Sequence, residues 1–132
     1  YHRRLDRRGV LRRDGTGLAL KVGRVGHVRI AAGHVKGYLP ADKDGRAGCL
    51  RALEQRSRQE NETQLFIETP YRNDALLTDA LAVLHPETRL CVACDLTLPS
   101  QQIVSQSVAQ WRKMSVLPSL KKRPALFVLH AV

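Results

Sequence analysis

Apolar and polar residues alternate in regular blocks from residue 35 to the end of the chain. Residues 35–40 form a short apolar run that ends at a proline, which predicts a strand. Residues 43–59 place apolar residues on one side and arginines on the other, which predicts an amphipathic helix with Asp42 as its N-cap. The arginines expected on the solvent side of this helix are Arg46, Arg51, Arg56 and Arg58.

Further blocks follow this helix. The apolar run over residues 64–68 predicts a buried strand, and residues 73–84 keep leucines at helical spacing, which predicts a second helix. Residues 89–95 are apolar throughout their centre, which indicates a strand inside a sheet. The last blocks predict an edge strand over residues 102–107, a short helix over residues 107–114 and a buried strand over residues 124–131.

The order of these blocks is strand, helix, strand, helix, strand, strand, helix, strand. Such an order predicts an α/β fold, with helices packed on a mixed sheet of about five strands. The chain of 132 residues is long enough for one such domain. We therefore expect residues 35–132 to form the domain.

Residues 1–34 show no clean helical or strand period. Glycines interrupt each candidate helix, and only residues 22–30 alternate weakly, as a strand would. The segment is therefore predicted to be irregular and rich in Arg and Gly. Two interpretations stay open: a flexible basic arm that binds nucleic acid, or a solvated tail.

The net charge of +10 favours a polyanionic partner, and nucleic acid is the usual one. The charge is unevenly distributed. Nine of the 22 Lys and Arg residues but only two of the 12 acidic residues lie in residues 1–34. That segment carries +7 and the remainder carries +3, so the predicted domain is only mildly basic.

Cysteine usage and hydropathy bear on the compartment. No apolar run approaches the roughly 20 residues that span a bilayer, and no secretory signal pattern opens the chain. The odd count of three cysteines favours a reducing, cytoplasmic compartment. Cys91 and Cys94 form a C-x-x-C pair, but the apolar run around them favours two buried structural thiols over a metal or redox site.

Polar residues follow two of the predicted strands. Glu68 and Thr69 come directly after one buried strand, where ligands often bind in α/β sheets. Arg72 stands in the first turn of the next helix, where the helix dipole disfavours a cation. It therefore needs a partner, which is either an internal carboxylate (Glu68 or Asp95) or a bound anion. Asp95 follows another strand and is able to hold a ribose hydroxyl, orient Arg72 or cap the turn before Pro99.

Four collinear segments carry a resemblance to a known family. Together they resemble the C-terminal domain of the tetrapyrrole methylases, the class III methyltransferases that use S-adenosylmethionine (SAM). The branch most similar to this chain is ribosomal RNA small subunit methyltransferase I, a 2′-O-cytidine methylase, with its paralogues. The segments are Lys36-Gly-Tyr-Leu-Pro, Gln64-Leu-Phe-Ile-Glu-Thr-Pro-Tyr-Arg-Asn, Arg89-Leu-Cys-Val-Ala-Cys-Asp-Leu-Thr and Lys122-Arg-Pro-Ala-Leu-Phe-Val-Leu.

The resemblance implies an enzyme that binds SAM between two domains and methylates ribosomal RNA as a cytoplasmic homodimer. A corrinoid or another small molecule is the alternative acceptor. The Gly-rich motifs of the family's N-terminal domain have no match in residues 1–34, so this chain alone is expected to be inactive. By position, the residues that would contact the cofactor are Ile67, Glu68, Thr69, Ala93, Cys94, Pro124 and Ala125, and Tyr71, Arg72 and Asp95 would form the substrate rim. The resemblance assigns no catalytic residue.

Overall fold

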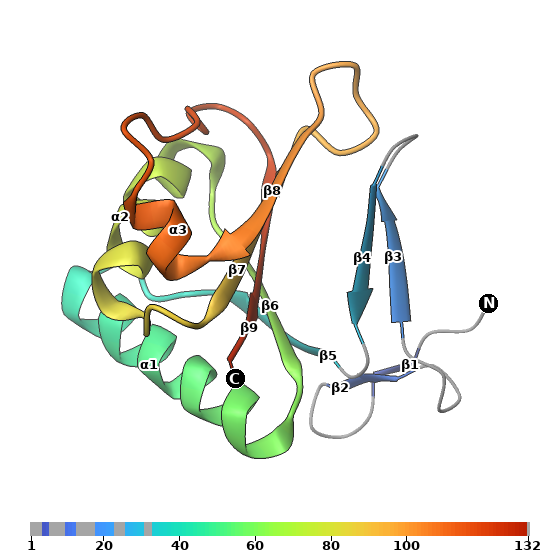
Figure 1. Ribbon diagram of the computed structural model, residues 1–132, viewed down its shortest axis with the longest axis vertical. Coiled ribbons are helices and arrows are strands. Elements are labelled where there is room, and N and C mark those ends of the chain that lie inside the picture. Colours follow the sequence, from blue (N-terminus) through green and yellow to red (C-terminus); the bar gives the residue numbers. More distant parts are fainter. Residues whose placement is uncertain (1–3, 6–9, 13–17, 23–25, 31–32, 132) are drawn as a thin grey trace.

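A mixed β-sheet with helices on one face forms the body of the protein (Figure 1). The computed structural model describes residues 4–5, 10–12, 18–22, 26–30 and 33–131. In these parts of the chain a seven-stranded sheet has the order β1-β2-β5-β6-β9-β7-β8, and β3 pairs with β4 in a separate hairpin. The strands are β1 Arg4–Leu5, β2 Val10–Arg12, β3 Leu18–Val22, β4 Gly26–Ile30, β5 Gly33–Tyr38, β6 Thr63–Ile67, β7 Arg89–Cys94, β8 Gln102–Ser107 and β9 Ala125–His130. The helices are α1 Lys43–Glu60, α2 Asn73–Val83, α3 Val108–Arg112 and the short 3₁₀ helix η1 Pro70–Arg72.

Strand direction decides which loops meet. β5 and β6 are parallel, whereas β9 runs antiparallel to both of its neighbours, β6 and β7. β5, β6 and β7 therefore point the same way and end at one edge of the sheet. β8 and β9 begin at that same edge, because both are antiparallel to β7.

The structure confirms the predicted α/β class and the order of elements after residue 33. The five strands β5–β9 form the mixed sheet, β7 has neighbours on both sides and β8 lies at an edge. The described parts of the first 34 residues differ from the expected irregular segment, because they contain the strands β1 to β4. Short strands interrupted by glycines carry too few residues to show a period in the sequence. Their regular structure comes from pairing: β2 pairs with β5, and β3 pairs with β4.

The main core lies between the helices and one face of the sheet. Trp111 of α3 is fully buried there, and its indole Nε1 donates a 2.8 Å hydrogen bond to the carbonyl oxygen of Leu90. Phe66 of β6 and Phe127 of β9 stack with ring centroids 5.5 Å apart. Because its N–H is hydrogen-bonded, the tryptophan buries a large apolar area in the core and leaves no donor unsatisfied.

Arg46 of α1 is buried, contrary to its expected position on the solvent side. Only 4% of it is exposed, and it lies on the same helical face as Leu50 and Leu53. Its guanidinium donates to Asp79 Oδ2 of α2 at 2.8 Å and to Glu68 Oε2 at 3.5 Å. Its Nη2 also donates to the carbonyl oxygen of Ala41 at 3.2 Å. The charge is tolerated in the interior because carboxylates from two other elements meet it, which the local sequence does not reveal.

Replacing Arg46 with alanine is expected to lower the free energy of unfolding by about 3–5 kcal/mol, because Glu68 and Asp79 lose the cation that compensates their burial. Arg51→Ala, an exposed position on the same helix, is the matched control and should change stability by no more than about 0.5 kcal/mol. Urea unfolding followed by circular dichroism measures both. Equal effects of the two substitutions would contradict the role given to Arg46.

Candidate functional site

The strand ends at one edge of the sheet bring distant segments together. Residues 39–42, 68–72 and 95–101 follow β5, β6 and β7, and residues 113–124 lead into β9 at the same edge (Figure 1). A direct backbone bond joins two of these segments, since the amide of Asp95 donates to the carbonyl oxygen of Pro124 at 3.0 Å. Ligands of α/β proteins commonly bind beyond such strand ends.

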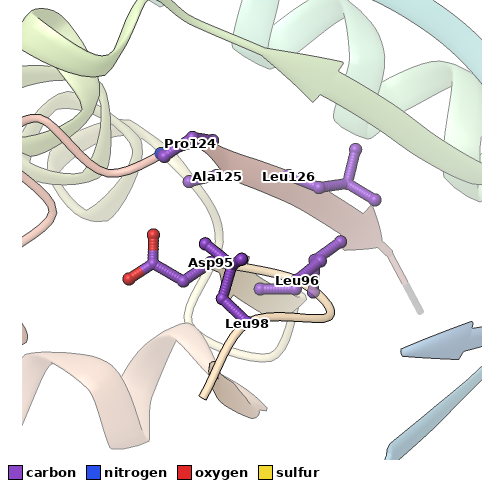
Figure 2. A pocket seen from close by; sticks show the side chains of 7 residues that line it. Asp95, Leu96, Leu98, Pro124, Ala125 and Leu126 are labelled. Carbon is purple, nitrogen blue, oxygen red and sulfur yellow. The ribbon is translucent and has the colours of Figure 1, made fainter. Parts of the chain in front are cut away.

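A small, mainly apolar cavity of about 250 Å³ opens beside the end of β7 and the start of β9. Figure 2 shows the carboxylate of Asp95 at one end of the lining, with Leu96 and Leu126 toward the other. Leu98, which is 52% exposed, lines the cavity from the loop after β7. The lining residues are Ala93, Asp95, Leu96, Leu98, Pro124, Ala125 and Leu126.

Arg123 holds the loop that forms one wall of this cavity. Its Nε donates to Asp95 Oδ2 at 2.7 Å, and its Nη2 donates to the carbonyl oxygen of Ser100 at 2.9 Å. Its Nη1 donates to the carbonyl oxygen of Ser119 at 3.0 Å. One guanidinium therefore joins the end of β7, the following loop and the segment before β9.

Asp95 is fixed by backbone as well as side chain. Its φ of 52° is a left-handed conformation that Asp and Asn tolerate better than most residues. Ser100 Oγ donates a second bond to Asp95 Oδ2 at 3.0 Å. The hydrogen bond from Arg123 is the main reason that the pKa of Asp95 lies below its ordinary value of 3.8. Asp95 thus orients Arg123 rather than Arg72, and its carbonyl accepts from the amide of Leu98 in the turn before Pro99.

Glu68 is buried and serves the structure of the rim. Its Oε1 accepts a 2.7 Å hydrogen bond from the amide of Thr69, while its Oε2 faces Arg46. Ile67 and Thr69 on either side are partly exposed. The Glu68 carboxylate therefore holds the backbone of this turn in place, and both of its oxygens already have partners within the protein.

Arg72 lacks the internal carboxylate partner that was one of the two interpretations of its position. Its side chain is exposed and forms no ion pair with any residue that the structure describes, since Glu68 pairs with Arg46 and Asp95 with Arg123. Tyr71 beside it is 75% exposed. Arg72 is therefore a solvent-exposed cation at the rim, and neither Glu68 nor Asp95 is its partner.

The two cysteines of β7 point to opposite faces of the sheet, because their separation of three residues is odd. Cys94 packs in the main core under the helices, and Cys91 packs with Leu65 and Val128 on the other face. Burial raises the pKa of Cys91 to about 11 and also raises that of Cys94. These thiols cannot share a metal ion, and both act as small apolar residues. Within the described part of the chain, no group of three or more His, Cys, Asp and Glu side chains is arranged to hold a metal.

The cavity is lined by some of the residues that the sequence predicted for the cofactor site and substrate rim, but not by all of them. Ala93, Pro124, Ala125 and Asp95 line it, whereas Ile67, Glu68, Thr69 and Cys94 do not. Tyr71 and Arg72 lie outside its lining, on the neighbouring loop. The sequence did not single out Leu96, Leu98 and Leu126, which line the cavity, or Arg123, which holds the loop beside it. The only local signal for Arg123 was a basic pair directly before a proline and an apolar strand.

No protein-family model and no curated protein matches the chain. Among solved structures, the methyltransferase CobJ is 13% identical with a TM-score of 0.43 over 72% of this chain and 39% of its own. A uroporphyrin-III C-methyltransferase from Thermus thermophilus, complexed with S-adenosylhomocysteine, is 18% identical with a TM-score of 0.33 over 52% of this chain and 30% of its own. The chain thus spans less than half the length of these structures. None of the helices that the structure describes combines the length and hydropathy needed to cross a bilayer.

The Asp95–Arg123 pair predicts a pH-dependent contribution to stability. Because the folded pKa of Asp95 is lowered, this contribution is present above the unfolded pKa near 3.8 and is lost as pH falls through the folded pKa. Asparagine tolerates the left-handed backbone at this position, so Asp95→Asn removes only the charge. The variant should therefore be less stable than the wild type at neutral pH. The two proteins should converge in acid. Urea unfolding at a series of pH values measures the difference.

Glu87→Gln is the control for this comparison, because Glu87 is an exposed acidic residue on the turn before β7. Its stability should follow the wild type at every pH. If Asp95→Asn remained less stable than the wild type by the same amount in acid, the stability difference would not come from the charge of the Asp95 carboxylate.

Proposed function

We propose that this chain is the C-terminal half of a SAM-dependent methyltransferase that methylates ribosomal RNA, by transfer to a 2′-hydroxyl of cytidine. The observation that carries the proposal is the cavity at the end of β7 and the start of β9. Its lining includes Ala93, Pro124 and Ala125, which come from two of the four segments that resemble the tetrapyrrole methylases. A homodimer in the cytoplasm belongs to the same proposal and rests on the resemblance alone.

The chemistry of the lining suits a nucleoside. Leucines at one end offer an apolar surface for a flat ring, and Asp95 at the other end offers a carboxylate. Arg123 and Ser100 both donate to Oδ2 of Asp95, so Oδ1 is the oxygen that would accept from a ribose hydroxyl. Arg123 keeps that carboxylate ionised and oriented, which favours acceptance of such a bond.

The residues described here bind and orient rather than react. SAM, when bound, would supply an activated methyl group, and the chain's part is to fix its position beside the acceptor oxygen. Arg123 and Arg46 hold the loops after β7 and β6, and these loops would form one side of a cleft closed by a second domain. With only one side present, the affinity of this chain for SAM should be weak.

A second candidate function comes from the charge of residues 1–34, which is +7. In this interpretation the chain is a non-catalytic nucleic-acid-binding module. RNA binding and its salt dependence would then be lost when that segment is removed. RNA binding that survives the deletion would exclude this function.

Titration of the isotope-labelled chain with S-adenosylhomocysteine, followed by NMR, tests the cofactor site. We expect weak, fast-exchanging shifts at millimolar ligand, confined to residues 67–69, 93–98 and 123–126. Leu98→Trp should abolish them, because Leu98 lines the cavity and the larger ring would occupy part of its volume. Val116→Trp is the control, since Val116 is also an exposed apolar residue but lies outside the lining.

Two results would contradict the proposal in different ways. Shifts that are absent, or that Val116→Trp weakens as much as Leu98→Trp does, would show that the cavity is not the cofactor site. Calorimetry giving micromolar affinity of the wild-type chain for SAM would show that the chain holds a whole site rather than half of one.

A further inference from the structure

Two exposed segments lie side by side at the rim, next to the cavity. The amide of Lys122 donates to the carbonyl oxygen of Pro70 at 3.3 Å, and Asn73 Nδ2 donates to the carbonyl oxygen of Arg123 at 2.6 Å. The amide of Leu120 donates to Asp74 Oδ1 at 2.8 Å. Three bonds therefore fasten the segment before β9 to the start of α2, although about 50 residues separate them in the sequence.

This junction carries three exposed cations and one carboxylate, so its local charge is positive. Arg72, Lys121 and Lys122 are exposed, and none forms an ion pair with a residue that the structure describes. Asp74 is the carboxylate at the junction, and its Oδ1 already accepts from Leu120. Arg123 points its charge inward to Asp95, so it adds no free cation to the surface.

The same junction carries an exposed tyrosine. Tyr71 directly precedes Arg72, and Pro70, whose carbonyl binds Lys122, directly precedes Tyr71. A single exposed tyrosine needs no explanation, but one flanked by unpaired cations on a fixed backbone has the composition of a surface for single-stranded RNA. In such surfaces bases stack on aromatic rings while Lys and Arg contact phosphates.

We propose that Tyr71, Arg72, Lys121 and Lys122 form the acceptor surface of the enzyme and bind single-stranded RNA. A base stacks on Tyr71, and the flanking phosphates contact the three cations. This inference rests on the proposed function and names the residues that hold its substrate.

The position of the surface agrees with that role. Lys122 is two residues before Pro124, which lines the cavity, and Tyr71 is in the same loop as Thr69. RNA held on the surface would therefore lie next to a nucleoside in the cavity. The short connections on both sides restrict how far the two ligands can separate, which is what methyl transfer between them requires.

Fluorescence anisotropy with an unstructured, labelled RNA oligonucleotide tests the surface, using the full chain so that residues 1–34 contribute equally to every variant. Tyr71→Ala should weaken binding by about 5- to 150-fold without changing the salt dependence, because stacking involves no counterion release. Tyr71→Phe keeps the ring and should bind like the wild type. The double variant Lys121→Gln, Lys122→Gln should reduce the slope of log affinity against log salt by about 1.4, or about 0.7 for each lost phosphate contact.

Matched controls separate this surface from the general charge of the chain. Arg51→Gln with Arg89→Gln removes two exposed cations, one from α1 and one from the opposite end of β7, and Tyr38→Ala removes an exposed tyrosine from β5. These variants should bind RNA like the wild type. Equal losses in the control and surface variants would overturn the proposal. Binding of a carboxylated macrocycle, such as uroporphyrin, is measured on the same variants. Surface variants that weaken macrocycle binding but leave RNA binding unchanged would also overturn the proposal.

The S-adenosylhomocysteine titration of the same variants distinguishes this inference from the proposed function. Surface variants with normal cofactor shifts and weakened RNA binding support both. If the cofactor shifts are present but the surface variants bind RNA as tightly as the wild type does, only the acceptor surface is overturned. RNA binding that depends on the surface, in a chain that shows no cofactor shifts, overturns the cavity as the cofactor site and with it the role of the surface as an acceptor site.

Discussion

The last strand has to pair with two strands at once, and the candidate site depends on that pairing. β9 lies antiparallel between β6 and β7, with Phe127 opposite both Phe66 and Val92. The chain must therefore enter the sheet at the edge where β6 and β7 end. This geometry lays Pro124 against Asp95 and draws residues 113–123 across the rim. Without β9 in that position neither the cavity nor the junction with α2 would exist.

Two arginines fix the rim that β9 creates. Arg46 ties the loops after β5 and β6 to α2, and Arg123 ties the loop after β7 to the segment before β9. Burying charge costs free energy, and a buried pair adds little net stability over apolar residues of similar size. The pairs are better understood as constraints on geometry. Each guanidinium has several donors in a fixed plane, so one side chain fixes the relative positions of three segments.

The rim divides into two chemically different parts. The cavity is mainly apolar, and its one carboxylate, Asp95, is already paired with a cation. The surface beside it carries exposed cations and an exposed ring. Such a division suits two ligands of different character: a nucleoside that is buried, and a polyanion that stays in contact with solvent. The segment before β9 belongs to both parts, because Pro124 lines the cavity and the exposed Lys121 and Lys122 precede it.

The sequence alone determined much of the architecture after residue 33. The apolar runs of β6, β7 and β9 and the helical spacing of α1 and α2 are local patterns, and residues such as Asp42 cap their helix through a neighbour three positions away. The positions of Glu68 and Asp95 after strands also follow from local order. What each carboxylate does was decided by residues far away in the chain. Arg46 was expected to face solvent, and Arg72 was expected to pair with an internal carboxylate or a bound anion. Tertiary structure buried the first and left the second exposed. The reason is that a charge enters the interior only where distant groups compensate it, and for Arg46 those groups are Asp79 of α2 and Glu68 at the end of β6.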